Sequence, residues 1–145
     1  KEILTRLKAP VKTTERVVSL VALHMYDFDC KTGENKLRRF FVEHYPLLED
    51  LLKVKQADFS ACTDDLSIAP TIVKWQAILE KMRRENAPLT LKQLAVSGKD
   101  LLALGISPPR ISHLLHALLL HAVCNPKDNE KTRLLKLALG FEKNM

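Results

Sequence analysis

The C-terminal part of the chain opens with Pro88-Leu-Thr-Leu-Lys-Gln-Leu-Ala-Val-Ser-Gly98-Lys-Asp-Leu-Leu-Ala-Leu-Gly105, in which short apolar runs alternate with residues that begin and end helices. Thr90 is placed to cap a short helix, because its hydroxyl can accept hydrogen bonds from the free amides of a first turn. Gly98 and Gly105 each follow a run of helix-forming residues, where a glycine can take the left-handed conformation that ends a helix. The pattern therefore predicts short helices separated by tight turns.

A long helix is predicted from about Pro109 to Cys124. Two prolines stand at its start, since proline fits the first turn of a helix and misfits the interior. Apolar residues recur three and four positions apart, as on one face of a helix: Ile111, Leu114, Leu115, Leu118 and Ala122. An asparagine-proline pair follows Cys124 and stops this helix. Asn129 is then expected to cap a last helix that ends near Gly140.

These turns together resemble the C-terminal tail of bacterial CCA-adding tRNA nucleotidyltransferases. The resemblance lies in Leu94-Ala-Val-Ser-Gly98-Lys-Asp-Leu101, Leu104-Gly-Ile106, Leu114-Leu115, and Pro126 with Asn129. It implies a helical body and tail that hold the acceptor stem and T-arm elbow of a tRNA, while an N-terminal catalytic head adds nucleotides to the 3′ end. Where the family has a Pro-Gly turn and a second glycine, this chain has Pro109 and Ser112. Because proline has no amide to offer, this turn is a poor phosphate cradle.

Charge is compatible with an RNA partner. The net charge is +6, and residues 87–145 hold eight Lys or Arg against four Asp or Glu, while residues 1–86 hold fifteen against thirteen. A basic surface attracts polyanions by Coulomb steering and counterion release. A solvated basic surface without a partner fits the charge equally well. The predicted boundary lies at Asn86-Ala-Pro88 and separates a helical body, residues 1–86, from a tRNA-binding tail, residues 87–145.

An all-α fold is predicted, a helical bundle body followed by a small helical tail. Strand signals are nearly absent, and four glycines are too few for a fold rich in hairpins. Helices in the body are expected at about residues 13–25, 34–45, 47–58 and 70–85, with a polar loop at residues 60–65. The single tryptophan, Trp75, lies at core spacing, which favours packing over the stacking of bases.

A metal site has to be considered at His24, Asp27 and Asp29, which are potential ligands close together in the sequence. This stretch resembles the helical region of the same nucleotidyltransferases that is related to HD-type phosphohydrolases. Those hydrolases bind divalent metals through a His-Asp doublet, and the chain contains no adjacent His-Asp. A degenerate metal-dependent hydrolase is therefore the weaker alternative, and no metal site is predicted.

Candidate RNA contacts are the basic residues of the tail, followed by arginines of the body. The first set is Lys92, Lys99, Arg110, Lys127 and Arg133, and the second set is Arg38, Arg39, Arg83 and Arg84. Adjacent arginines on a helix point in different directions, so Arg38 and Arg39 have an alternative role in an ion pair with another helix. Asp100 is expected to brace the turn after Gly98 and not to touch RNA.

Catalysis is expected to lie outside this chain. Nucleotidyl transfer needs carboxylates that bind two Mg²⁺ ions. The family supplies them from a Gly-Ser turn followed by an Asp-x-Asp pair, a module that this sequence lacks. We therefore expect no catalytic residue and no cofactor in this chain, and Mg²⁺ in an absent head. The missing initiator methionine also suggests a fragment. Whether the full protein adds CCA, CC, A or poly(A) is not decided by the sequence.

The remaining expectations concern partners and location. The expected partners are a tRNA and the chain's own N-terminal catalytic domain, with a homodimer left open. A helical scaffold or dimerisation module without RNA binding is a further alternative. No apolar run reaches the ~18 residues of a membrane-spanning helix. Three cysteines at wide spacings suit reduced thiols in a cytoplasmic protein.

Overall fold

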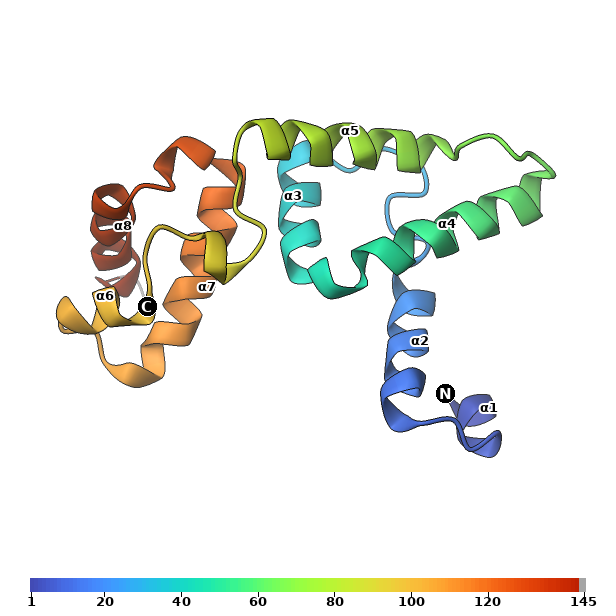
Figure 1. Cartoon of the computed structure of the whole chain (residues 1–145), viewed down its shortest axis with the longest axis horizontal. Coiled ribbons are helices and arrows are strands. Elements are labelled where there is room, and N and C mark those ends of the chain that lie inside the picture. The colour runs from blue at the N-terminus through green and yellow to red at the C-terminus, as the bar shows by residue number, and fades with distance from the viewer. Residues whose placement is uncertain (144–145) are drawn as a thin grey trace. The chain divides into compact units, whose positions relative to one another are not determined.

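The computed structural model describes residues 1–143, which fold into helices joined by turns and loops (Figure 1). The helices are α1 (Glu2–Arg6), α2 (Val11–Leu23), α3 (Glu34–Glu43), α4 (Leu48–Thr63), α5 (Pro70–Arg84), α6 (Gly98–Ala103), α7 (Pro108–Cys124) and α8 (Lys131–Lys143). Short 3₁₀ turns lie at Tyr45–Leu47, Leu91–Gln93 and Pro126–Asp128. Because residues 1–143 contain no strand, the all-α prediction is confirmed. Within the same residues, no helix combines the length and the apolar character needed to cross a membrane.

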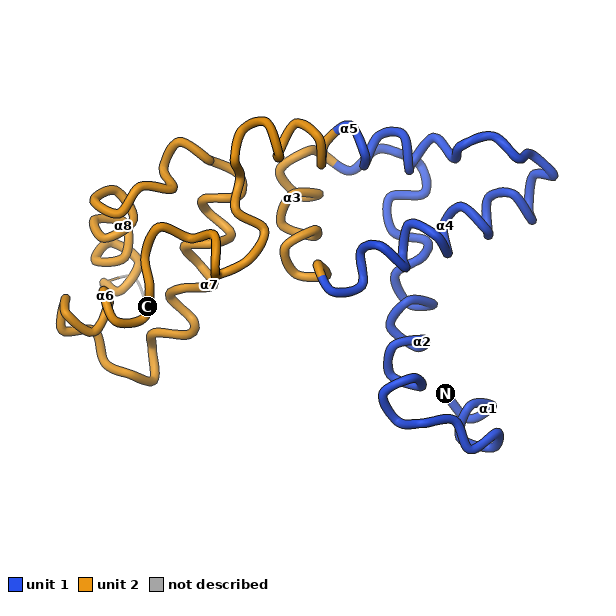
Figure 2. The backbone as a smooth tube through the Cα atoms, in the orientation of Figure 1, with its two compact units in different colours: residues 1–32, 46–77 blue, residues 33–45, 78–145 orange. Residues whose placement is uncertain are grey.

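The chain divides into two compact units (Figure 2). Unit 1 comprises residues 1–32 and 46–77, and unit 2 comprises residues 33–45 and 78–145. These bounds differ from the predicted segments, because α3 and the second half of α5 cluster with the C-terminal helices. The functional division at residues 86 and 87 stays a prediction.

Unit 1 is built from α1, α2, α4 and the first half of α5. Helix α2 packs on α4. The fully or nearly buried apolar side chains of this unit are Leu20, Leu48, Leu51, Ala69, Ile72 and Trp75. Trp75 is 0% exposed, so its predicted core position is confirmed. The polar loop was predicted at residues 60–65, but α4 continues through Thr63 and ends where Asp64 takes a left-handed conformation, with φ +53°.

Unit 2 is organised around α7, on which α3, α6 and α8 pack. Its buried apolar side chains come from these four helices and from the second half of α5, and they include Leu37, Phe41, Met82, Leu101, Leu114, Leu118, Val123, Leu134 and Ala138. Pro108 and Pro109 occupy the first turn of α7, and Asn125 follows its last residue, as predicted. The helical period of the sequence therefore located this central helix correctly.

Two glycines of the predicted tail, Gly98 and Gly105, have different roles. Gly105 has φ +83°, the left-handed conformation expected just after a helix. The same prediction for Gly98 was wrong, because Gly98 is the first residue of α6. A Cβ built on Gly98 would lie 3.3 Å from Cγ2 of Ile111, so the absence of a side chain lets α6 approach α7 closely. Gly98 serves helix packing and not helix termination.

Asn129 was predicted to cap the last helix, and this prediction was also wrong. Helix α8 begins two residues later and continues past Gly140, its expected end. The Asn129 side chain instead spans to a distant segment: its Oδ1 accepts a hydrogen bond from the Ala95 amide (2.9 Å), and its Nδ2 donates to the Gln93 carbonyl (2.9 Å). Asn129 therefore fixes the segment between the 3₁₀ turn at Leu91–Gln93 and α6.

Candidate nucleic-acid interface

The start of α6 is held by side-chain hydrogen bonds. Ser97 precedes the helix, and its amide and hydroxyl donate to Oδ2 of Asp100 at 2.8 and 2.7 Å. Asp100 also forms an ion pair with Lys131 of α8 at 2.6 Å. Hydrogen bonding from Lys131, followed by that from Ser97, holds the pKa of Asp100 far below its usual value. Asp100 thus braces this turn, as expected, although the turn begins a helix.

Arg38 on α3 is buried in an ion-pair network. Its side chain is 3% exposed, and its guanidinium donates to Glu34 (2.7 and 2.9 Å) and to Glu85 (2.6 Å). A further hydrogen bond of 3.0 Å reaches the carbonyl oxygen of Val123 on α7. Burial lowers the pKa of Arg38, but hydrogen bonding to Glu85 and Glu34 outweighs it and raises the pKa above its usual value. Arg38 therefore forms the ion pair with another helix that the sequence left as its alternative role, and its contact with RNA stays an untested prediction.

A cleft of about 950 Å³ lies beside this network in unit 2. It is formed by the start of α3, the end of α5, the 3₁₀ turn Pro126–Asp128 and α8. Its lining includes five basic side chains, Lys36, Arg38, Lys81, Lys127 and Arg133, and three acidic ones, Glu34, Glu85 and Asp128. We call this feature the basic cleft.

Of the predicted contacts, Lys127 and Arg133 line the basic cleft together. Arg133 lies 3.4 Å from Asp128 and 3.2 Å from Glu130, and it donates a 3.2 Å hydrogen bond to the Lys127 carbonyl. The Lys127 side chain is exposed. The structure thus brings two residues of the first predicted set into one surface feature, while their contact with RNA stays a prediction.

The other predicted contacts lie outside the basic cleft and are all exposed. They are Lys92, Lys99, Arg110, Arg39, Arg83 and Arg84. Two of them have acidic neighbours, since Arg110 lies 3.7 Å from Glu142 and Arg83 lies 3.3 Å from Glu80. Exposed ion pairs at such distances contribute little and can exchange partners, so these arginines stay available to an anion.

Sequence reasoning missed Lys36, which lines the basic cleft from the first turn of α3. Its position two residues after the helix start was readable, because Gly33 precedes a helix-forming run. What the sequence did not show is that this turn faces the residues around Lys127, which lie about ninety positions later in the chain. Only the packing of α3 on α7 brings the two lysines to one cleft.

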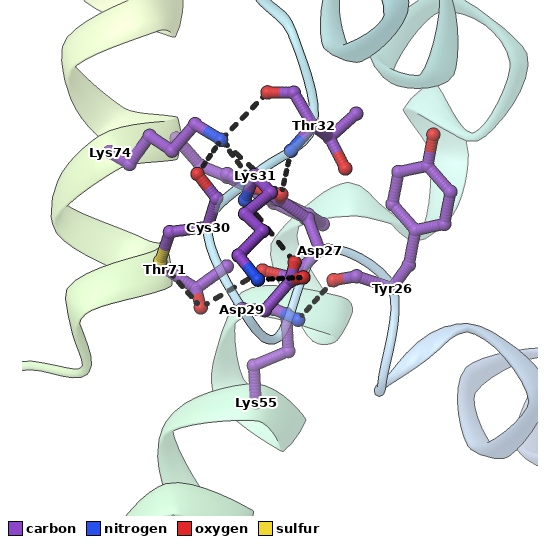
Figure 3. Close-up of polar contacts among 10 residues, drawn as sticks. Tyr26, Asp27, Asp29, Cys30, Lys31, Thr32, Lys55, Thr71 and Lys74 are labelled. Carbon is purple, nitrogen blue, oxygen red and sulfur yellow. Dashed lines mark hydrogen bonds and ion pairs between the residues drawn. The ribbon is translucent and has the colours of Figure 1, made fainter.

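A second polar cluster, in unit 1, surrounds Asp27 (Figure 3). The Asp27 side chain is 0% exposed and accepts hydrogen bonds from Trp75 Nε1 (2.9 Å) and from the Thr32 amide (2.8 Å). Lys74 forms an ion pair with it at 3.1 Å and also donates to two loop carbonyls. Burial raises the pKa of Asp27, but the hydrogen bonds from Trp75, Thr32 and Lys74 together outweigh it and lower the pKa. Both oxygens of the Asp27 carboxylate therefore accept hydrogen bonds from other groups of the protein.

Lys55 of α4 holds the other end of the same loop (Figure 3). Its Nζ donates to the carbonyls of His24 (2.8 Å) and Tyr26 (2.7 Å) and lies 4.8 Å from the centre of the Trp75 ring. Burial lowers the pKa of Lys55, although the charge of Asp27 partly offsets this effect. The two lysines together fix the loop between α2 and α3.

The geometry favours a structural role for the histidine and aspartates of this loop. His24 Nδ1 lies 2.6 Å from the Val21 carbonyl, and Asp29 accepts a hydrogen bond from the Lys31 amide at 3.2 Å. Across residues 1–143, no three His, Cys, Asp or Glu side chains gather where they could hold a metal ion.

The basic cleft carries more basic than acidic side chains, five against three, and a positive surface attracts polyanions. Comparison with known proteins is more specific. Over 121 residues, or 81% of its length, the chain is 33% identical to the A-adding tRNA nucleotidyltransferase of Deinococcus radiodurans. The match covers 27% of that relative, so the chain spans about a quarter of its length. No protein-family model and no solved structure matches the chain. The similarity relates the chain to tRNA nucleotidyltransferases.

Proposed function

We propose that this chain is the tRNA-binding, C-terminal part of a tRNA nucleotidyltransferase and holds the acceptor stem and T-arm elbow during nucleotide addition. The observation that carries the proposal is the similarity to the A-adding tRNA nucleotidyltransferase. The similarity extends through 81% of this chain but only 27% of the relative.

The chemistry of the surface supports an RNA partner. Double-stranded RNA is recognised mostly by shape and by contacts to its phosphates and 2′-hydroxyls, because its deep groove cannot be read by side chains. Contacts of this kind need exposed cations on a rigid support. Unit 2 offers such cations on α6 and α7, with Lys99 and Arg110, and on two 3₁₀ turns, with Lys92 and Lys127.

We place the nucleotide-adding chemistry in a catalytic head outside this chain, where carboxylates would bind Mg²⁺. The choice between adding A alone and adding CCA belongs to that head. The three cysteines are unpaired in the structure, which suits the cytoplasm, the compartment that we propose for the enzyme.

Salt titration of tRNA binding tests the proposal. The affinity of the 145-residue chain for a fluorescent tRNA transcript would be measured between 50 and 300 mM KCl. With about four to six phosphate contacts, the logarithm of the affinity is expected to fall with the logarithm of salt with a slope of about −3 to −5. A scaffold that only packs on a catalytic head, or that forms a dimer, would show no tRNA affinity, or affinity insensitive to salt, and either result would refute the proposal.

A further inference from the structure

The acidic side chains that line the basic cleft are neutralised within unit 2. Glu34 and Glu85 both receive hydrogen bonds from Arg38, and Glu34 also pairs with Lys81 at 3.0 Å. Asp128 lies 2.8 Å from Nε2 of His121 and 3.4 Å from Arg133. Hydrogen bonding from Lys81, with a further contribution from Arg38, lowers the pKa of Glu34 although burial raises it. Each of these three carboxylates therefore lies within 3.4 Å of a Lys or Arg side chain of unit 2.

Two lysines of the basic cleft have no acidic side chain as an ion-pair partner among residues 1–143. Lys36 and Lys127 are exposed, and within residues 1–143 neither ammonium group is in an ion pair. Because the other charges of the lining are paired, the positive potential of the basic cleft comes mainly from these two groups. A surface with unmatched positive charge in a concave site attracts an anion of matching size.

The size and lining of the basic cleft fit a segment of polynucleotide backbone. A volume of about 950 Å³ is at the upper end of small-ligand sites, and the cleft is lined by lysines with neutral polar residues such as Asn35 and Asn125. It contains no aromatic side chain on which a base could stack. Backbone amides of the first turn of α3 add hydrogen-bond donors at one end, since Gly33 provides no side-chain cap.

We propose that the basic cleft binds the sugar-phosphate backbone of the tRNA through Lys36 and Lys127, with Arg38 as the residue that positions α3 against α7. This inference rests on the proposed function and names the site where the RNA backbone lies. The Arg38 network keeps Lys36 and Lys127 on one rigid surface, because it joins α3, the end of α5 and the Val123 carbonyl of α7.

The test compares two double variants of the 145-residue chain. Lys36→Ala with Lys127→Ala removes both unmatched charges of the basic cleft. Lys136→Ala with Lys143→Ala is the control: it removes two exposed lysines of α8 that do not line the basic cleft. Both double variants therefore lower the net charge by the same amount. All four side chains are exposed, so both variants are expected to keep the thermal midpoint of the wild type, measured by circular dichroism. Fluorescence anisotropy with a labelled tRNA then gives affinity and salt dependence.

The cleft variant is expected to bind tRNA about ten-fold more weakly at 0.15 M salt and to lose about 1.5 to 2 units of the salt slope, whereas the control loses less than about two-fold in affinity. Equal affinities of the two variants would overturn the cleft assignment while leaving the proposed function intact. Absence of tRNA binding by the wild type would overturn both. A phosphate could also come from a free nucleotide, so ATP is titrated in parallel: ATP binding that the cleft variant loses while its tRNA affinity is unchanged would contradict the assignment to RNA.

Discussion

Replacement of Asp27 by asparagine tests how unit 1 holds the loop that follows α2. Asp27 has φ +58°, and asparagine tolerates this left-handed conformation better than other residues without a charge, so the substitution removes charge with little backbone strain. It leaves the Lys74 ammonium without its counterion and places an amide NH2 group opposite one of the two donors, Trp75 Nε1 or the Thr32 amide, so that one of these hydrogen bonds is lost. The perturbation therefore removes the charge and one acceptor of the cluster while keeping the size of the side chain.

The expected loss of unfolding free energy is about 2–4 kcal/mol. Removing one partner of a buried ion pair costs roughly 3–5 kcal/mol. We expect a cost around the lower end of that range, because the Lys74 side chain is 25% exposed and keeps its hydrogen bonds to the carbonyls of Cys30 and Thr32. Asp29→Asn is the matched control: Asp29 is exposed and lies 3.8 Å from Lys31, so its loss is expected to change stability by less than about 0.5 kcal/mol.

Urea unfolding followed by the fluorescence of the single tryptophan, Trp75, measures this effect at the residue that contacts Asp27. The lowered pKa of Asp27 also sets the pH dependence. A carboxylate whose pKa is lower in the folded state stabilises the fold above its unfolded pKa of about 3.9, and this stabilisation is lost as pH falls through the lower folded pKa. The difference between wild type and Asp27→Asn should therefore be full near pH 7 and shrink below about pH 4. An Asp27→Asn variant as stable as the Asp29→Asn control at pH 7 would refute the reasoning.

Two further substitutions probe unit 2 by chemical unfolding followed by circular dichroism. Arg38→Met should cost about 3–5 kcal/mol, because it leaves Glu85 and the Val123 carbonyl without their donor and removes one of the two cations that pair with Glu34. The matched substitution of the exposed neighbour, Arg39→Met, should cost less than about 0.5 kcal/mol, and equal effects would contradict the assigned roles. Asn129→Ala should cost about 1–2 kcal/mol through two lost hydrogen bonds. Asn129→Asp, which keeps the acceptor and loses the donor, should fall between wild type and Asn129→Ala; wild-type stability of Asn129→Ala would show that the link is unimportant.

The elements with a strong helical period could be predicted from the sequence. Helix α5 was expected at residues 70–85 and is found at Pro70–Arg84, with Trp75 in the core. The prolines at the start of α7 and the asparagine-proline pair after it gave its bounds. Proline restricts the backbone locally, so these signals depend on no distant partner.

The errors arose where a distant contact, or an overlooked local one, decides the role of a residue. Asn129 was assigned to a cap because asparagine favours helix starts, but its partners lie more than thirty residues away. Arg38 was given two alternatives, and the choice depended on Glu85 and Val123, which reach it only in the folded unit. The role of Gly98 was locally readable, because the Ser97-x-x-Asp100 spacing is the signature of a helix start.

Competition between a folded and an unfolded RNA tests the central claim most directly, namely that this chain recognises the shape of a tRNA through its phosphates. A labelled tRNA bound to the 145-residue chain would be displaced with unlabelled folded tRNA, and separately with an unstructured RNA of the same length and charge. The account predicts that folded tRNA competes at a concentration at least about ten-fold lower, since only a folded duplex presents phosphates in the spacing that a rigid helical surface can match. Equal competition by the two RNAs would contradict it.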